Sequence, residues 1–182
     1  ITINLSCPNT EGGMPFIESS NYEKLMVEVD KIETKNPIFY KISPDMSHME
    51  ADSFLDIAEK HKVSGIICTN LLKKYNQNEI KDLAPFKGGL SGKIAFPKAL
   101  DLLSYMYKKV GKKYIFIFSG GIFSADDAYK VIKQGASLVE LITAMIFEGP
   151  QVISEINRGL VEKLNRDGFK NISEAVGIEN KG

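Results

Sequence analysis

The fold class is decided by one stretch of the chain, YIFIFSGGIFSADDAYKVIKQGASLVELIT, which is residues 114–143. Its apolar, β-branched runs predict one strand over Tyr114–Phe118 and another over Ser137–Ile142. Between them the pattern predicts a helix from about Ala125 to Gln134, after Ser124, which is a good helix N-cap. A strand, a helix and a strand in this order form a parallel unit with a right-handed crossover. The stretch therefore indicates an α/β protein.

The same alternation runs through the rest of the chain. Further strands are predicted at Ile1–Leu5, Pro37–Ile42 and Ser64–Thr69, and further helices at Tyr22–Ile32, Met49–His61, Pro97–Lys109 and Pro150–Arg166. Such near-continuous apolar strands suit a parallel sheet that is covered on both faces. Two architectures fit this pattern, an open doubly wound sheet and a closed (β/α)8 barrel.

A barrel needs eight strands and typically about 250 residues. The chain of 182 residues offers five strands, so under the barrel interpretation its first three units are missing. The sequence also begins at Ile1, inside an apolar run and without an initiator Met. We therefore expect a fragment that covers roughly the last five βα units.

Composition excludes several other classes of protein. The formal net charge is +0, which gives no sign of a nucleic-acid partner. The two cysteines, Cys7 and Cys68, match no metal-ligand spacing, so no metal site is expected. No apolar run approaches the roughly 20 residues that span a bilayer, and no signal peptide is recognisable.

Polar residues follow each predicted strand at the end where an α/β protein carries its site. They are Asn4 to Thr10, Lys41, the pair Thr69 and Asn70, the run Ser119 to Gly121, and Thr143. Taken singly, these residues have ordinary explanations: Asn9 suits a turn, Cys7 can be a small buried residue, and Lys41 can extend to the surface. Five consecutive strand ends with polar groups instead indicate one ligand site.

Two glycine-rich stretches suggest what the ligand is. Gly120, Gly121 and Thr143 end the last two strands, where barrels often bind phosphate through loop amides. The second stretch, GGLSGK at residues 88–93, lacks the glycine spacing of a nucleotide-binding P-loop. We interpret it instead as a loop that lies against a flat ring system, since glycine lets the backbone approach a ligand closely.

These residues, in this order, resemble the dihydroorotate dehydrogenases over essentially the whole chain. The resemblance rests on NLSCPN (4–9), YKISPD (40–45), TN (69–70), GGLSG (88–92), FSGGIFSADDA (118–128), GASLVELITAMIFEGP (135–150) and GFKNISEAVG (168–177). It implies that residues 1–182 are the C-terminal part of a single FMN-binding (β/α)8 TIM-barrel domain, with Ile1–Leu5 as its fourth strand. It also implies the oxidation of dihydroorotate to orotate, with FMN as hydride acceptor, in de novo UMP biosynthesis.

Carried over residue by residue, the resemblance implies a set of site residues. Those for FMN are Asn4, Lys41, Thr69, Gly92, Gly121, Ile142 and Thr143; those for the substrate are Asn4, Asn9, Asn70 and Leu71; and the catalytic base is Cys7. Cys7 would take the proton from C5 of dihydroorotate while hydride leaves C6 for flavin N5. Lys41 would lie by the N1–C2=O edge of the flavin, and Ile142 would act through its backbone. Leu71 replaces a small hydroxyl residue that is usual in the family.

The resemblance points in two directions for the electron acceptor. Cys7 is the base of the soluble, cytoplasmic class 1 enzymes, which use fumarate or NAD, whereas class 2 enzymes use Ser. The GGLSGK, GASLVELITA and GFKNISEAVG motifs instead resemble the membrane-associated class 2 enzymes of the bacterial or mitochondrial inner membrane. Because this similarity spreads over many positions, we expect quinone as acceptor. Membrane contact would come only through an N-terminal segment that precedes this sequence.

Two other interpretations stay open. One is the related FMN-dependent dihydropyrimidine dehydrogenase barrel, which shares an NLSCP-type segment. The other is a non-catalytic barrel fragment or regulatory binding module, against which stand the retained Asn4, Cys7, Asn9, Lys41 and Asn70.

Overall fold

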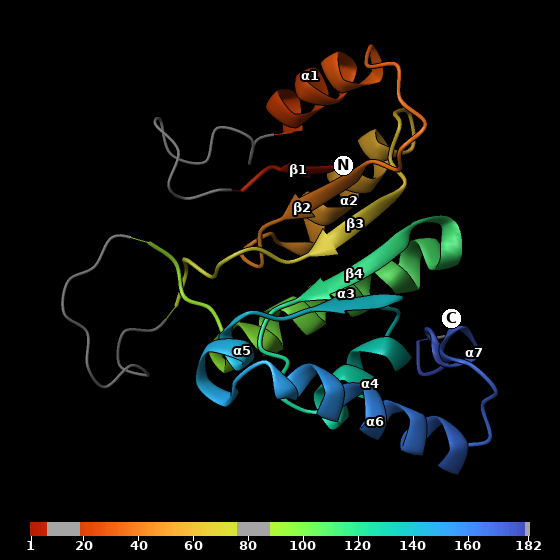
Figure 1. Ribbon diagram of the computed structural model, residues 1–182. Coiled ribbons are helices and arrows are strands. Elements are labelled where there is room, and N and C mark those ends of the chain that lie inside the picture. The colour runs from red at the N-terminus through yellow and green to blue at the C-terminus, as the bar shows by residue number, and fades with distance from the viewer. Residues whose placement is uncertain (7–18, 76–87, 181–182) are drawn as a thin grey trace.

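The computed structural model describes residues 1–6, 19–75 and 88–180, and within them five parallel strands form one sheet (Figure 1). The strands are β1 (Thr2–Asn4), β2 (Phe39–Ile42), β3 (Gly65–Cys68), β4 (Ile115–Ser119) and β5 (Leu138–Glu140). Their order in the sheet is their order in the chain. A doubly wound sheet reverses its strand order at a switch point. This sheet never does, so it has the topology of a barrel segment.

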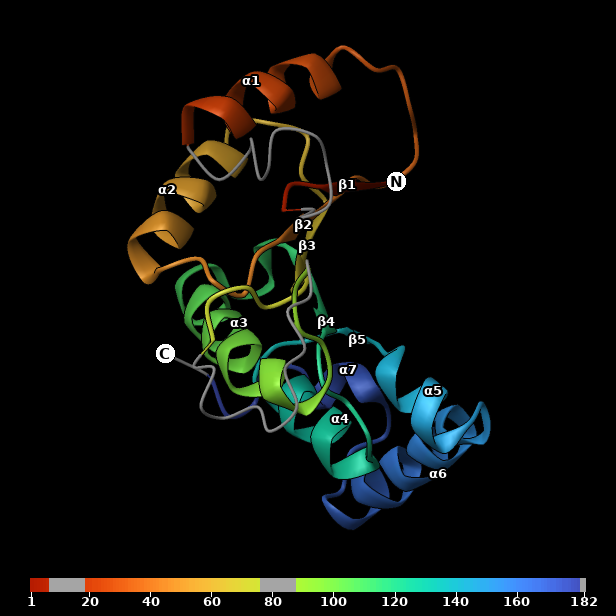
Figure 2. The ribbon, with the colours of Figure 1, turned by 90° about the vertical axis from the view of Figure 1, so that its left-hand side faces the viewer.

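The helices follow the predicted alternation. They are α1 (Ser19–Asp30), α2 (His48–Ala58), α3 (Phe96–Val110), α4 (Ala125–Lys133), α5 (Thr143–Glu148), α6 (Gln151–Arg166) and α7 (Ile172–Ala175), with 3₁₀ turns at Lys93–Ala95 and Gly111–Lys113. Five of them correspond to the five predicted helices, and α5 and α7 were not predicted. Figure 2 shows α1, α2 and α3 along one side of the sheet. None of the helices in the described part of the chain is long and apolar enough to span a membrane.

The two faces of the sheet have different environments. Tyr40, Phe116 and Phe118 are fully buried in the core that the sheet forms with the helices. The alternate positions point to the other face, where Ile115 is 45% and Leu138 58% exposed. The expectation of a sheet covered on both faces therefore holds at β3, where Ile66 and Ile67 are both buried, but not at the exposed positions of β4 and β5. This second face is the one that a closed barrel would turn toward its interior.

Side-chain caps fix where two helices begin, and so fix the loops that precede them. Ser47 and Glu50 form a reciprocal capping box at the start of α2. Ser124 accepts a hydrogen bond from the backbone N–H of Asp127 at 3.2 Å, as predicted for the N-cap of α4. The turn between β4 and α4 therefore has a defined conformation beside the strand ends.

Candidate active site

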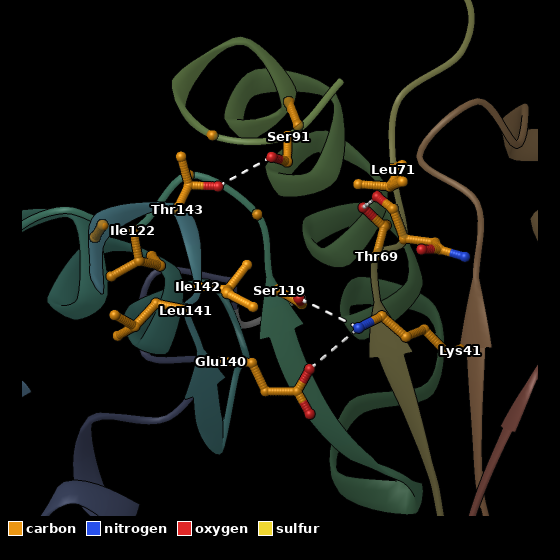
Figure 3. Close-up of a pocket in the computed structure, with 16 residues that line it drawn as sticks. Lys41, Thr69, Leu71, Ser91, Ser119, Ile122, Glu140, Leu141, Ile142 and Thr143 are labelled. Carbon is orange, nitrogen blue, oxygen red and sulfur yellow. Dashed lines mark hydrogen bonds and ion pairs between the residues drawn. The ribbon is translucent and has the colours of Figure 1, made fainter. Parts of the chain in front are cut away.

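A pocket opens at the carboxyl ends of β2, β3, β4 and β5 (Figure 3). Eight of the predicted site residues line it: Lys41, Thr69, Asn70, Leu71, Gly92, Gly121, Ile142 and Thr143. They come from strand ends and loops that lie far apart in the sequence. The sheet brings them together because the carboxyl ends of parallel strands meet at one edge.

One wall of the pocket is built from glycine backbone. Gly92 and Gly121 have φ angles of +84° and +76°, which L side chains rarely adopt. A Cβ on Gly92 would stand 3.1 Å from Cγ2 of Thr143, and a Cβ on Gly121 would stand 2.7 Å from the Gly92 carbonyl oxygen. A side chain at either position would thus fill the space that the loops enclose. Such a cradle suits a ligand that the backbone approaches closely.

Two hydroxyl groups complete this wall. The Oγ of Ser91 and the Oγ1 of Thr143 lie 3.0 Å apart in hydrogen-bond contact. Ile142 precedes Thr143 at the start of α5 and is 68% exposed. Hydroxyls and glycine amides are the groups that hold phosphate esters in such loops. This wall therefore carries the kinds of group that can hold a phosphate ester.

The opposite side of the pocket carries the charged groups. Lys41 Nζ lies 3.3 Å from Glu140 Oε2 and 3.5 Å from Ser119 Oγ, as the dashed lines in Figure 3 show. The Lys41 side chain is 23% exposed, so its ammonium lies partly shielded from water. A cation in this position can stabilise negative charge on a bound ring system.

A polar cluster continues from the pocket toward β1. The Asn70 side-chain amide donates hydrogen bonds to Asn4 Oδ1 and to the Ser6 carbonyl, both at 3.0 Å. Asn4 Oδ1 also accepts from the Ser6 backbone N–H at 3.2 Å. Asn4 is not a lining residue of the pocket, but this contact holds it beside Asn70. The prediction that Asn4 and Asn70 share one site is consistent with this geometry.

Thr69 is 2% exposed, and its backbone N–H donates to the Ser119 carbonyl at 2.8 Å. Its hydroxyl donates to the Asn70 carbonyl at 3.3 Å. Leu71 lines the pocket and, as the sequence predicts, contributes no hydroxyl there. The predicted base Cys7 and the predicted substrate ligand Asn9 lie outside the described residues.

Glu140 and Ser91 also line the pocket, although the sequence does not predict either of them as a site residue. A signal for Glu140 was present, because it is an acidic residue inside the otherwise apolar segment LVELI, as Lys41 is a basic residue in an apolar strand. Ser91 lay within the glycine-rich loop that we expected at the ligand.

The fold and the pocket define the chain as part of a parallel β/α barrel with a ligand site at the carboxyl ends of its strands. The family model described as dihydroorotate dehydrogenase matches residues 1–164. The chain therefore belongs to the dihydroorotate dehydrogenase family, as predicted.

Similar proteins agree with this assignment. A dihydroorotate dehydrogenase (quinone) from Sulfurovum sp. is 38% identical over 180 residues, which are 98% of this chain and 49% of that protein. One from Nitratiruptor sp. is 36% identical over 179 residues, 98% of this chain and 50% of that protein. The chain thus spans about half the length of the curated relatives it matches.

The crystal structure of a ligand-free dihydroorotate dehydrogenase (DHODH) from Eimeria tenella superposes with a TM-score of 0.89 and 30% identity. It covers all of this chain, and this chain covers 55% of that one. The prediction of a partial (β/α)8 TIM barrel is confirmed by this comparison.

Proposed function

We propose that the protein oxidises dihydroorotate to orotate, with FMN as hydride acceptor and a quinone as final electron acceptor, in de novo pyrimidine biosynthesis. The observation that carries the proposal is the pocket, in which eight predicted residues from four strand ends line one cavity. Relatives named dihydroorotate dehydrogenase (quinone) support the same activity.

FMN would take up the hydride, because flavins carry this chemistry themselves. The Gly92 and Gly121 backbone, with the hydroxyl of Thr143, would hold its phosphate. Thr69 would line the ring, and the Lys41 ammonium would stabilise negative charge at the ring's N1–C2=O edge.

The substrate would bind through the amides of Asn4, Asn9 and Asn70. The contact between Asn4 and Asn70, 3.0 Å between Nδ2 and Oδ1, supports the idea that the two act on one ligand. Cys7 would remove the proton from C5 of dihydroorotate. A thiol with a reference pKa of about 8.5 can be tuned into a base near neutral pH.

Quinone is the acceptor that we propose, because the relatives with this name match 97–98% of the chain. A membrane-associated location accompanies this proposal, since quinones dissolve in the bilayer. The alternative is a class 1 enzyme that uses fumarate or NAD, for which Cys7 is the one argument.

The test follows flavin absorbance in the full-length protein. Dihydroorotate should bleach the bound FMN, and a short-chain quinone should then restore its colour within one turnover. Fumarate and NAD, added separately to the reduced protein, should restore it much more slowly. If fumarate or NAD reoxidised the flavin and quinone did not, the class 1 alternative would hold. If dihydroorotate failed to bleach the flavin, the proposed activity would be wrong.

A further inference from the structure

Lys41 and Glu140 form an ion pair across the sheet, with β3 and β4 between the strands that carry them. Lys41 Nζ lies 3.3 Å from Glu140 Oε2, although 99 residues separate the two in the sequence. Figure 3 shows both side chains directed toward each other across the pocket, with Ser119 beside them. The contact therefore lies within the pocket where we propose that the flavin binds.

These two residues are the only charged ones among the described residues that line the pocket. One positive and one negative side chain leave this part of the pocket without net charge. Their side chains are 23% and 44% exposed, so water screens the pair less than it would screen a pair on the open surface. The charge that Lys41 offers to a ligand consequently depends on Glu140.

The stability of the fold does not by itself explain why Lys41 and Glu140 form an ion pair. A partly exposed ion pair such as this one contributes little to the free energy of folding, because fixing two long side chains in one geometry costs conformational entropy. Ser119 Oγ also lies at the edge of hydrogen-bond distance from Lys41 Nζ, 3.5 Å, and provides a neutral partner. Because Ser119 already offers Lys41 a hydrogen-bond partner, the main effect of the Glu140 carboxylate is to add a negative charge to the site.

We propose that Glu140 is a positioning residue for Lys41 that holds the ammonium at the pocket and offsets part of its positive charge. The proposal rests on the proposed function, because it assumes that FMN binds in this pocket. A ring system beside Lys41 gains negative charge on reduction, and a nearby cation stabilises that charge. Glu140 therefore weakens the preference of the site for reduced over oxidised flavin. The residue would set the reduction potential rather than take part in proton or hydride transfer.

The test compares the FMN-loaded full-length protein with its Glu140→Gln variant. Glutamine keeps a hydrogen-bond acceptor for Lys41 but removes the negative charge. We expect the equilibrium ratio of reduced to oxidised flavin at fixed potential to rise about tenfold, which is about 30 mV in the two-electron midpoint potential. Sulfite, which adds to oxidised flavin and places negative charge on the ring, should bind about tenfold more tightly, because the same electrostatic interaction stabilises both charged forms.

A matched control uses an ion pair at the other end of the sheet. Glu59 pairs with Lys113, which precedes β4. Glu59→Gln removes the same charge from the same kind of pair, and we expect it to leave both the potential and the sulfite affinity unchanged. A shift in both variants would mean that overall charge, and not Glu140, sets the potential.

A double-mutant cycle with Lys41→Gln tests whether Glu140 acts through Lys41. In the Lys41→Gln background, Glu140→Gln should still raise the potential through the loss of its own charge, but by less than in the parent, because no ammonium remains for Glu140 to hold. An equal change in both backgrounds would overturn the positioning role. So would a Glu140→Gln variant that binds FMN with unaltered potential, and in that case the proposed function would still stand.

If Glu140→Gln did not retain FMN, Glu140→Asp would replace it in the same measurements. Aspartate keeps the negative charge but holds it farther from Lys41. The ratio of reduced to oxidised flavin should therefore rise by less than the tenfold expected for Glu140→Gln. No rise with either variant would contradict the proposal. A parent protein that bound no FMN would instead contradict the proposed function.

Discussion

Gly121 lies so close to Gly92 that a side-chain carbon on Gly121 would stand 2.7 Å from the Gly92 carbonyl oxygen. The same carbon would stand 2.9 Å from Cβ of Phe96. The turn after β4 and the loop before α3 therefore meet with no room for a side chain. This close approach forms the wall where we propose that the FMN phosphate binds.

The first prediction is that Gly121→Ala abolishes flavin binding by the full-length protein. The added methyl group must push the two loops apart, and it also strains a residue with φ of +76°. The measurement is the ratio of flavin to protein absorbance, with circular dichroism as the check of folding.

Gly168 provides a matched control, because its φ is +80° and a Cβ added there would have no neighbouring atom within 4 Å. Gly168→Ala should lose about 1 kcal/mol of stability from backbone strain and keep its flavin. A Gly121→Ala variant with undiminished flavin would rule out this wall as the phosphate site.

Much of the fold could be predicted from local sequence patterns. Each strand is a short apolar run, and each of the five main helices has apolar residues at helical spacing. The position of the pocket could be predicted as well, because the carboxyl ends of parallel strands lie at the same edge of the sheet. The choice between a doubly wound sheet and a barrel could not be made this way, because strand order depends on contacts between distant units. The family resemblance, and not the patterns, supplied that choice.

Two features of the site were beyond local patterns. Helix α5 buries only Ala144, while Ile146 and Phe147 are 72% and 75% exposed, so its apolar residues show no inward spacing. The contact between Lys41 and Glu140 depends on how β2 and β5 are arranged across two intervening strands. Sequence showed both charges but not the distance between them.

The second prediction concerns Asp45, whose side chain is only 5% exposed. Its Oδ2 accepts hydrogen bonds from the backbone N–H groups of Lys73 and Lys74, at 2.7 and 3.0 Å. Its Oδ1 lies 3.2 Å from Lys98 Nζ. Asp45 thus ties the segment after β3 to the loop after β2. Asp45→Ala removes these three contacts and should lower the free energy of unfolding by about 2 kcal/mol, since water can reach the donors that remain.

Urea denaturation at neutral pH measures this loss. The control is Glu28→Ala, which removes a partner of Lys31 from a pair with side chains 64–66% exposed. It should change the free energy of unfolding by no more than about 0.5 kcal/mol. Equal losses in the two variants would show that the burial of Asp45 contributes nothing.

The third prediction is a pH dependence of stability that arises from Asp127. Burial raises the pKa of its carboxyl group, but hydrogen bonds from Lys93 Nζ, the Phe123 backbone N–H and Ser124 outweigh burial, so the pKa lies below its usual value. A carboxyl group with a lowered pKa in the folded state stabilises the fold above its unfolded pKa of about 4. That contribution is lost as the pH falls from there through the folded pKa.

Asp127→Asn should therefore be less stable than the parent at neutral pH, and the difference should shrink as the pH falls below about 4. Urea midpoints of the two proteins across this range provide the measurement. A difference that stays constant with pH would mean that shape and hydrogen bonding at Asp127, and not its charge, stabilise the fold.

The last prediction concerns the two thiols, which we expect to behave oppositely. Cys7 is the proposed base, so Cys7→Ala should slow the bleaching of bound flavin by dihydroorotate by about 10²–10⁴-fold. Orotate affinity should change little, because Asn4, Asn9 and Asn70 are the proposed ligands. Stopped-flow absorbance gives the rate, and orotate titration gives the affinity.

Cys68 is the control, because it is fully buried and burial raises the pKa of its thiol far above the ordinary value. Such a thiol is not ionised near neutral pH and cannot serve as a base. Cys68→Ala should therefore slow flavin reduction far less than Cys7→Ala does, and its main effect should be a loss of stability from the cavity that it leaves. A Cys7→Ala variant that reduced its flavin as fast as Cys68→Ala would show that Cys7 is not the base.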